Sequence, residues 1–191
     1  FGTKVTVVEG LDRVLPLSSV DEECSKVITR EMKKKKIKII LNRTVESVEN
    51  HNEHLRISIA KSPFSTSPNN ETVPPQMIEA EKILICVGRK PNTDGIGLEK
   101  AGVVLDPKGW IFANEKMETS TNDIFAIGDV LGPSKIMLAH VASHEGIVAV
   151  ENAMGGNKHI DYDVVPGAIF TTPEVANVGL TENQAKEKST F

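Results

Sequence analysis

The chain has 191 residues, of which 39% are hydrophobic, enough for one large domain or for parts of two. Its 22 lysines and arginines stand against 26 aspartates and glutamates, and only 4% of its residues are aromatic, which argues against a nucleic-acid partner. No apolar run reaches the length of a membrane span and no signal peptide opens the chain, so we expect no membrane partner either.

The first segment predicts a parallel strand-helix-strand unit. Residues 4–9 form a short apolar run that ends in an acid, Glu9. The apolar residues that follow at helical spacing are Val20, Cys24, Val27, Ile28 and Met32. Ser18, Ser19 and Asp21 precede this amphipathic helix and can cap its start. Residues 36–41 then predict the second strand of the crossover.

The middle of the chain predicts an antiparallel meander and then a buried strand. Residues 44–48 and 55–60 have strand patterns, and the link between them is too short for a parallel crossover. The segment 62–75, rich in Ser, Pro and Asn, predicts a loop. The apolar run 83–87 predicts a buried strand, followed by a turn at residues 88–92.

The last third predicts a further strand, two helices and a pair of short strands. Residues 109–120 have no regular pattern, and the apolar run 124–127 predicts a buried strand that ends at Gly128-Asp129. A helix is expected over 137–154, because Gly155-Gly156 supplies a C-terminal cap.

Beyond that helix, residues 168–171 and 175–178 predict two short strands. Thr181 and Gln184 form a capping box, which predicts a final helix.

Two acids stand where α/β proteins bind ligands. Asp129 follows a predicted strand, at the edge where parallel sheets bind ligands, and a carboxylate accepts hydrogen bonds from sugar hydroxyls, although Gly-Asp alone is more typical of an ordinary turn. Glu9 ends a strand before a helix, where a Rossmann domain holds an adenosine ribose. Without a GxGxxG upstream, that spacing alone is more typical of a solvent-facing Glu. If the site is real, the acid repels a 2′-phosphate and favours NAD over NADP, and the nearby Arg13 is expected beyond a turn.

No metal site or catalytic group is expected within the chain. His140 and His144 have a spacing that metal ligands also use, but helix geometry turns Glu145 away from them and no third ligand stands out. Packed or backbone-bonded histidines are therefore the better interpretation. Cys24 and Cys86 have neither a CxxC nor a metal spacing, which favours a reducing, cytoplasm-like compartment.

Five blocks in this order carry a resemblance to one family. They are VTVVEGLDRVLP (5–16), ILICVGRKPNT (83–93), TSTNDIFAIGDV (119–130), MLAHVASHEG (137–146) and PGAIFTTPEVANVGLTE (166–182). Through essentially its whole length, the chain resembles the dihydrolipoamide dehydrogenases, which are flavoprotein pyridine nucleotide-disulfide oxidoreductases. The resemblance implies an α/β fold and an oxidoreductase that uses FAD and NAD.

The resemblance also implies a role for particular residues. The implied NAD contacts are Glu9 at the ribose, Val45 beside the adenine and Gly88 near the nicotinamide half. The implied FAD contacts are Gly128, Asp129, Met137, Leu138, Ala139 and His140. On this resemblance Asp129 matches the acid that binds the ribityl chain, and the MLAH segment matches the one whose backbone lies against the flavin ring. A helix N-terminus there stabilises the anionic edge of a reduced flavin.

Departures from the family pattern imply an internal fragment. In the family, electrons pass from a dithiol through a CxxxxC disulfide and FAD to NAD, with a C-terminal His-Glu pair as base. This chain has none of these groups, nor either GxGxxG. We expect a Rossmann-like NAD-binding domain with the meander at residues 1–88, a segment of an FAD-binding domain at 89–160, and the start of an α+β interface domain at 161–191.

The parent protein is expected to be a homodimeric dihydrolipoyl dehydrogenase, inactive as this fragment. Its partner is the dihydrolipoyl group of a lipoyl-bearing protein in a 2-oxoacid dehydrogenase or glycine cleavage complex, in a bacterial-type cytoplasm or an organelle matrix or stroma. Three alternatives remain. One is a flavoprotein disulfide reductase of mercuric, glutathione or transhydrogenase type, another a nucleotide-binding module without redox chemistry, and the third a structural piece of a proteolysed or incompletely sequenced enzyme.

Overall fold

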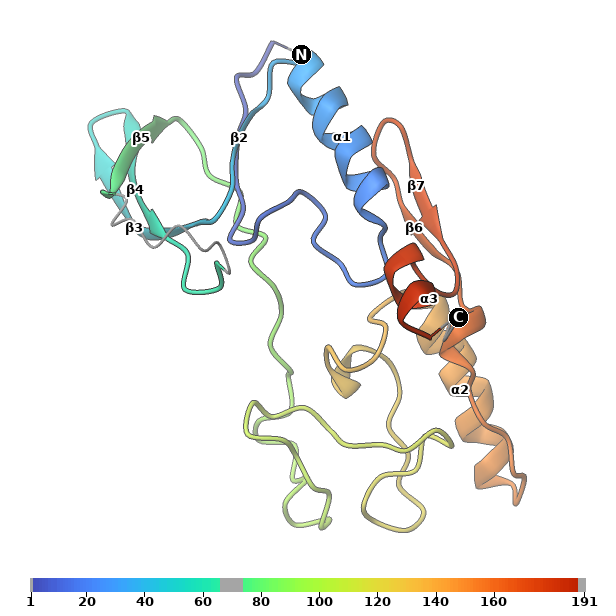
Figure 1. Ribbon diagram of the computed structural model, residues 1–191. Helices are drawn as coiled ribbons and strands as arrows, with labels where there is room; N and C mark the ends of the chain where they lie inside the picture. The colour runs from blue at the N-terminus through green and yellow to red at the C-terminus, as the bar shows by residue number, and fades with distance from the viewer. Residues whose placement is uncertain (1, 66–73, 189–191) are drawn as a thin grey trace. The chain divides into compact units, whose positions relative to one another are not determined.

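The computed structural model describes residues 2–65 and 74–188, which form two compact units. The first unit contains the described residues up to Cys86 and again from Ala168, and the second runs from Val87 to Gly167. Figure 1 shows both units and labels α1 to α3 and β2 to β7. The expected domain boundaries after residues 88 and 160 stay predictions, because a compact unit need not coincide with a cofactor domain.

A parallel crossover opens the first unit. Strand β1 (Thr6–Val8) pairs in parallel with β2 (Lys38–Ile40), and Val7 lies opposite Ile39. Helix α1 (Glu22–Lys34) connects the two strands, with acids in its first turn and lysines in its last turn, the order that the helix dipole favours. The strand-helix-strand prediction is confirmed, with both strands shorter than expected.

The core of the first unit joins α1 to the last part of the chain. Strands β6 (Gly167–Ile169) and β7 (Val175–Asn177) form a two-stranded sheet, as predicted, and run alongside α1 in Figure 1. The buried side chains of this core are Val14, Val20, Ile28 and Val175. Val27, predicted on the apolar face of the helix, is exposed instead. Neighbouring side chains on a helix point about 100° apart, so Val27 can face solvent while Ile28, the next residue, is buried.

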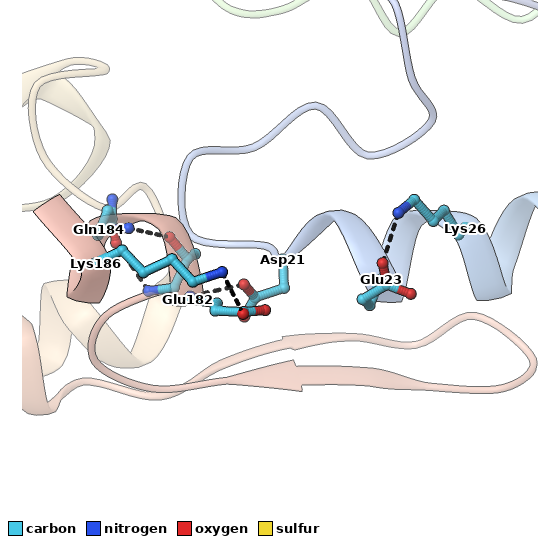
Figure 2. Close-up of polar contacts among 7 residues, drawn as sticks. Asp21, Glu23, Lys26, Glu182, Gln184 and Lys186 are labelled. Carbon is cyan, nitrogen blue, oxygen red and sulfur yellow. Dashed lines mark hydrogen bonds and ion pairs between the residues drawn. The ribbon is translucent and has the colours of Figure 1, made fainter.

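Asp21 lies at the start of α1 but caps a different helix. Its side chain makes no capping bond to α1; its Oδ1 accepts a hydrogen bond from the backbone N–H of Glu182, at 2.8 Å (Figure 2). Glu182 is the first residue of α3 (Glu182–Lys188). The prediction that Asp21 caps α1 through its side chain is therefore wrong, because an acceptor can serve any orphan N–H that the fold brings to it.

The predicted capping box of α3 is confirmed. The N–H of Thr181 donates to Gln184 Oε1 at 3.0 Å, and the N–H of Gln184 donates to Thr181 Oγ1 at 3.4 Å. These reciprocal bonds satisfy donors that the first turn of a helix leaves without partners.

An antiparallel meander completes the first unit. Its strands are β3 (Arg43–His51), β4 (His54–Lys61) and β5 (Gln76–Ala80), in that order across the sheet. The first two confirm the prediction, and the third was missed because its short pattern follows a polar segment. Of the predicted loop at 62–75, residues 66–73 lie outside the described part of the chain.

The run 83–87 is not the buried strand that its composition predicts. Leu84 is 87% exposed and Val87 is 92% exposed, and the segment belongs to no strand. A strand needs a hydrogen-bonding neighbour, and among the described residues the sheet of β1 contains only β2 as a partner. An apolar run therefore indicates a strand only if the fold supplies an edge for it.

The second unit also lacks the strand expected at 124–127. Glu118 and Phe125 form only an isolated antiparallel bridge. The two backbone bonds beside it run from Thr119 N–H to Ile124 O and from Ala126 N–H to Met117 O. Met117 and Asp123 have positive φ angles, so the chain turns away at both ends and the ladder stops. Gly128 and Asp129 instead begin the 3-10 helix η1 (Gly128–Leu131).

Helix α2 (Ala139–Ala153) packs on the core of the second unit and confirms the predicted helix, shortened at both ends. The buried hydrophobic residues of this core are Val103, Ile111, Met117, Ala126, Leu131, Val141, Val148, Ala149 and Ile160. Gly155 N–H donates to Asn152 O and Gly156 N–H to Glu151 O, each at 2.9 Å. This pair of bonds is a Schellman cap, as Gly155-Gly156 predicted.

Candidate functional site

In the first unit, Glu9 presents a carboxylate just beyond β1. Its backbone stays in register, because its N–H donates to Ile40 O and its carbonyl accepts from Arg43 N–H. The side chain is half-buried, and its Oε1 accepts a hydrogen bond from Leu11 N–H at 3.0 Å. Within the described residues Oε2 makes no hydrogen bond, so it can accept one from a ligand hydroxyl.

Arg13 does not compete for this carboxylate. Its guanidinium donates to the carbonyl oxygens of Leu15, Leu17 and Val20 at 3.0 to 3.1 Å. These bonds hold the arginine within the turn that leads into α1. Arg13 is therefore engaged with backbone carbonyls and does not offer its positive charge to the 2′-phosphate of NADP.

Val45 lies on the strand next to this turn. A Cβ placed on Gly10 would come within 3.5 Å of the Thr44 side chain, so the Glu9-Gly10 turn packs closely against the start of β3. Val45 itself is 42% exposed. The two residues implied at the ribose and the adenine thus lie on neighbouring segments of one unit, and an exposed aliphatic side chain suits a flat aromatic ring.

In the second unit, Asp129 is held by a residue that the sequence did not single out. Arg89 Nη1 lies 2.6 Å from Asp129 Oδ2, and both side chains are about half exposed. Arg89 also donates to the carbonyl oxygen of Met137, at 3.5 Å. The turn containing Gly88, the Gly128-Asp129 turn and the segment before α2 therefore meet at one guanidinium. The place of Arg89 directly after Gly88 was the only signal for it.

Gly128 adopts a conformation that other residues avoid. Its φ is +76°, and a Cβ there would come within 3.3 Å of Ala142 Cβ in α2. Its N–H donates to Glu145 Oε2 at 2.6 Å. Glycine is thus required by the local fold as well as by any ligand that approaches.

The segment 137–140 forms the entry to α2. Leu138 is extended and no side chain caps the helix, so N–H groups of the first turn have no side-chain acceptor. Met137 and Leu138 are half-buried, whereas Ala139 and His140 are exposed. A ring nitrogen of His140 lies 2.6 Å from Pro166 O, which makes it a backbone-bonded histidine as expected.

No redox or metal centre forms among the described residues. Cys24 and Cys86 are both free thiols, one half-buried and one exposed. No group of three His, Cys, Asp or Glu side chains there could hold a metal ion. Of the described helices, none is long and apolar enough to cross a membrane.

Comparison with known proteins gives the family. The model of the pyridine nucleotide-disulphide oxidoreductases matches residues 1–146, and the model of their dimerisation domain matches residues 165–190. This chain belongs to the pyridine nucleotide-disulphide oxidoreductase family. The family, the α/β fold class with its Rossmann-like part and the cofactor pair FAD and NAD are thereby confirmed.

Relatives from bacteria and plants match this chain over nearly all of its length. The chain is 43% identical to dihydrolipoyl dehydrogenase of Bacillus subtilis over 97% of its residues, and 38% identical to the mitochondrial dihydrolipoyl dehydrogenase of Pisum sativum over 98%. The crystal structure of LpdA from Mycobacterium tuberculosis matches 97% of the chain at 26% identity, with a TM-score of 0.83. The chain spans only 37%, 35% and 37% of these three proteins.

Proposed function

We propose that the whole protein carrying this chain is an NAD-dependent dihydrolipoyl dehydrogenase. It oxidises the dihydrolipoyl dithiol of a lipoyl-bearing protein to the disulfide, and NAD+ takes up two electrons and one proton as a second proton is released. The observation that carries the proposal is similarity to dihydrolipoyl dehydrogenases over almost the entire chain. The partner proteins are those of 2-oxoacid dehydrogenase or glycine cleavage complexes.

The NAD contacts in this proposal are Glu9, Val45 and Gly88. Glu9 fits a ribose, because one carboxylate oxygen is fixed by Leu11 N–H and the other is free to accept from a hydroxyl. The same charge repels the 2′-phosphate of NADP, and Arg13 is engaged with backbone carbonyls. This arrangement supports NAD as the electron acceptor.

The FAD contacts in this proposal are Gly128, Asp129, Met137, Leu138, Ala139 and His140. Asp129 fits a ribityl chain, because its half-exposed carboxylate is held by Arg89 through one oxygen and can accept through the other. The uncapped first turn of α2 offers N–H groups and a partial positive charge to an anionic ring. Bound FAD supplies the two-electron relay between the dithiol and NAD.

The remaining parts of the proposal lie at the level of the whole protein. The proposal assigns the CxxxxC pair and the His-Glu base to the rest of the whole protein, since this chain spans 37% of its Bacillus subtilis relative and its two cysteines are free thiols. The match of residues 165–190 to a dimerisation domain supports a homodimer. Our proposal places the start of the interface domain at residue 161. The bacterial and mitochondrial relatives support a reducing compartment, either cytoplasm or organelle matrix.

An assay of the whole protein tests the function. We expect a flavin absorbance spectrum, and NADH formation when dihydrolipoamide and NAD+ are supplied. We expect Glu9→Gln to narrow the preference for NAD over NADP by about tenfold, which corresponds to roughly 1.4 kcal/mol. Glu53→Gln, at the exposed turn between β3 and β4, is the matched control. A protein that reduces glutathione disulfide with NADPH and ignores dihydrolipoamide would refute the proposal.

A further inference from the structure

Glu145 is the one ionisable side chain among the fully buried residues of the described chain. It lies in the second turn of α2 and is only 1% exposed. Burying a carboxylate in a protein core is costly unless hydrogen bonds replace those that water made. Its presence in this core therefore requires partners, and these partners show what the residue does.

Both carboxylate oxygens of Glu145 have a partner. Oε2 accepts the N–H of Gly128 at 2.6 Å, and Oε1 accepts the hydroxyl of Tyr162 at 2.7 Å. Hydrogen bonds to an ionised group are about twice as strong as neutral ones. The glutamate thus links α2, the start of η1 and the 3-10 helix η2 (Tyr162–Val164) through two strong bonds.

The bond to Gly128 sets the direction in which Asp129 leaves the core. Gly128 has a positive φ and packs within van der Waals reach of Ala142, so its backbone is restricted from the side of α2 as well. Asp129 follows immediately and is held on its outer side by Arg89. The buried carboxylate and the exposed guanidinium therefore hold the two-residue turn from its two ends.

Tyr162 keeps the carboxylate oriented. Burial and the hydrogen bond to Glu145 raise the pKa of its hydroxyl well above the ordinary value of 10.0, so the hydroxyl remains a donor. Lys135 Nζ lies 4.8 Å from the centre of the Tyr162 ring, which restricts the ring from another side.

We propose that Glu145 and Tyr162 are positioning residues of the flavin site, which hold Asp129 in place for the ribityl chain by fixing the N–H of Gly128. The inference rests on the proposed function, because it takes Asp129 as the flavin contact. It assigns a role to the acid that helix geometry turns away from His140 and His144.

A double-mutant cycle on the dissociation constant of FAD tests this role in the whole protein. We expect Glu145→Ala to raise that constant by about tenfold or more, from the loss of a hydrogen bond to a charged group. In an Asp129→Ala background the same substitution has no further effect, because the residue through which it acts is gone. Glu145→Gln keeps an acceptor for Gly128 and recovers most of the loss. Glu151→Ala, an exposed acid of the same helix, is the matched control.

The outcomes separate this inference from the proposed function. Equal effects of Glu145→Ala with and without Asp129 would mean a merely structural role and would overturn the inference. Tyr162→Phe, which loses only the hydroxyl that donates to Glu145, is the second variant if Glu145→Ala does not fold; an unchanged dissociation constant of FAD in Tyr162→Phe then overturns the inference too. If Asp129→Ala itself leaves FAD binding unchanged, both the site and the inference fail. Failure of the unmodified protein to oxidise dihydrolipoamide would contradict the proposed function and would leave this inference unaffected.

Discussion

Position 132, which is a glycine, has neither the backbone conformation nor the space for a side chain. This glycine ends η1 with φ +78° and ψ −173°, a region of backbone space that only glycine visits readily. A Cβ at this position would lie 2.6 Å from Trp110 Cγ. The indole of Trp110, which is buried, occupies the space that a side chain would need.

We expect Gly132→Ala to destabilise the protein by about 3 kcal/mol or more, from backbone strain of roughly 1–3 kcal/mol and overpacking of a similar size. Gly97→Ala is the matched control, since Gly97 has φ +83° and no atom within 4 Å of its Cβ position. Its cost should stay near 1–2 kcal/mol, the penalty of a left-handed conformation alone. Urea unfolding of both variants measures the difference in the free energy of unfolding. Equal losses in the two variants would contradict the prediction, because they would mean that the Trp110 side chain moves aside without cost.

At the scale of elements, α3 depends on contacts at its first turn. The Thr181–Gln184 capping box and the carboxylate of Asp21 together accept the N–H groups of Thr181, Glu182 and Gln184. Gln184 Nε2 also donates to Ser18 O, so the same turn is tied twice to the segment before α1 (Figure 2 shows Asp21, Glu182 and Gln184). A helix of this length has too few internal bonds to be stable alone.

Thr181→Ala should therefore loosen α3 by about 1 kcal/mol, the usual cost of a lost N-cap. Hydrogen exchange of the amides in 182–188 should speed up accordingly. Lys186→Ala is the control, because it removes only the exposed ion pair with Glu182, and solvent screens such pairs so that they contribute little to stability. The prediction fails if the lysine variant exchanges as fast as the threonine variant.

At the scale of the whole molecule, the run 83–87 exposes apolar surface without a partner among the described residues. Leu84, Ile85 and Val87 are strongly exposed and lie within four consecutive residues of the chain. Contiguous apolar surface of this kind is where soluble chains associate. Within the described part of the chain this segment belongs to no strand, which leaves it able to pair with a strand of another copy.

The 191-residue chain made by itself should consequently self-associate, and Leu84→Lys should shift it toward monomer. A charge in the middle of the run opposes both apolar contact and strand pairing. Ile96→Lys, at an exposed apolar residue outside this run, should change little. Sedimentation velocity distinguishes these results, and an identical distribution for Leu84→Lys and the unmodified chain would contradict the prediction.

The candidate site could be predicted in part. Glu9 and Asp129 were recognised from their places after apolar runs and from the resemblance, while their roles as cofactor contacts stay proposals. Arg89 and Glu145 were missed as parts of the site, since their partners lie 40 and 17 residues away in the sequence. No local pattern marks a residue whose partner is that distant.

What the sequence determined by itself is the set of elements whose signals are local, together with the family. The β1-α1-β2 crossover, the paired strands of the meander, the Gly155-Gly156 cap and the Thr181–Gln184 box all follow from periodicity or from bonds between near neighbours. Only the tertiary structure decided that 83–87 and 124–127 form no strands, that Asp21 caps a helix 161 residues away, and that Glu145 is buried. Strand pairing, capping across the fold and burial of a charge depend on partners that the folded chain alone brings together.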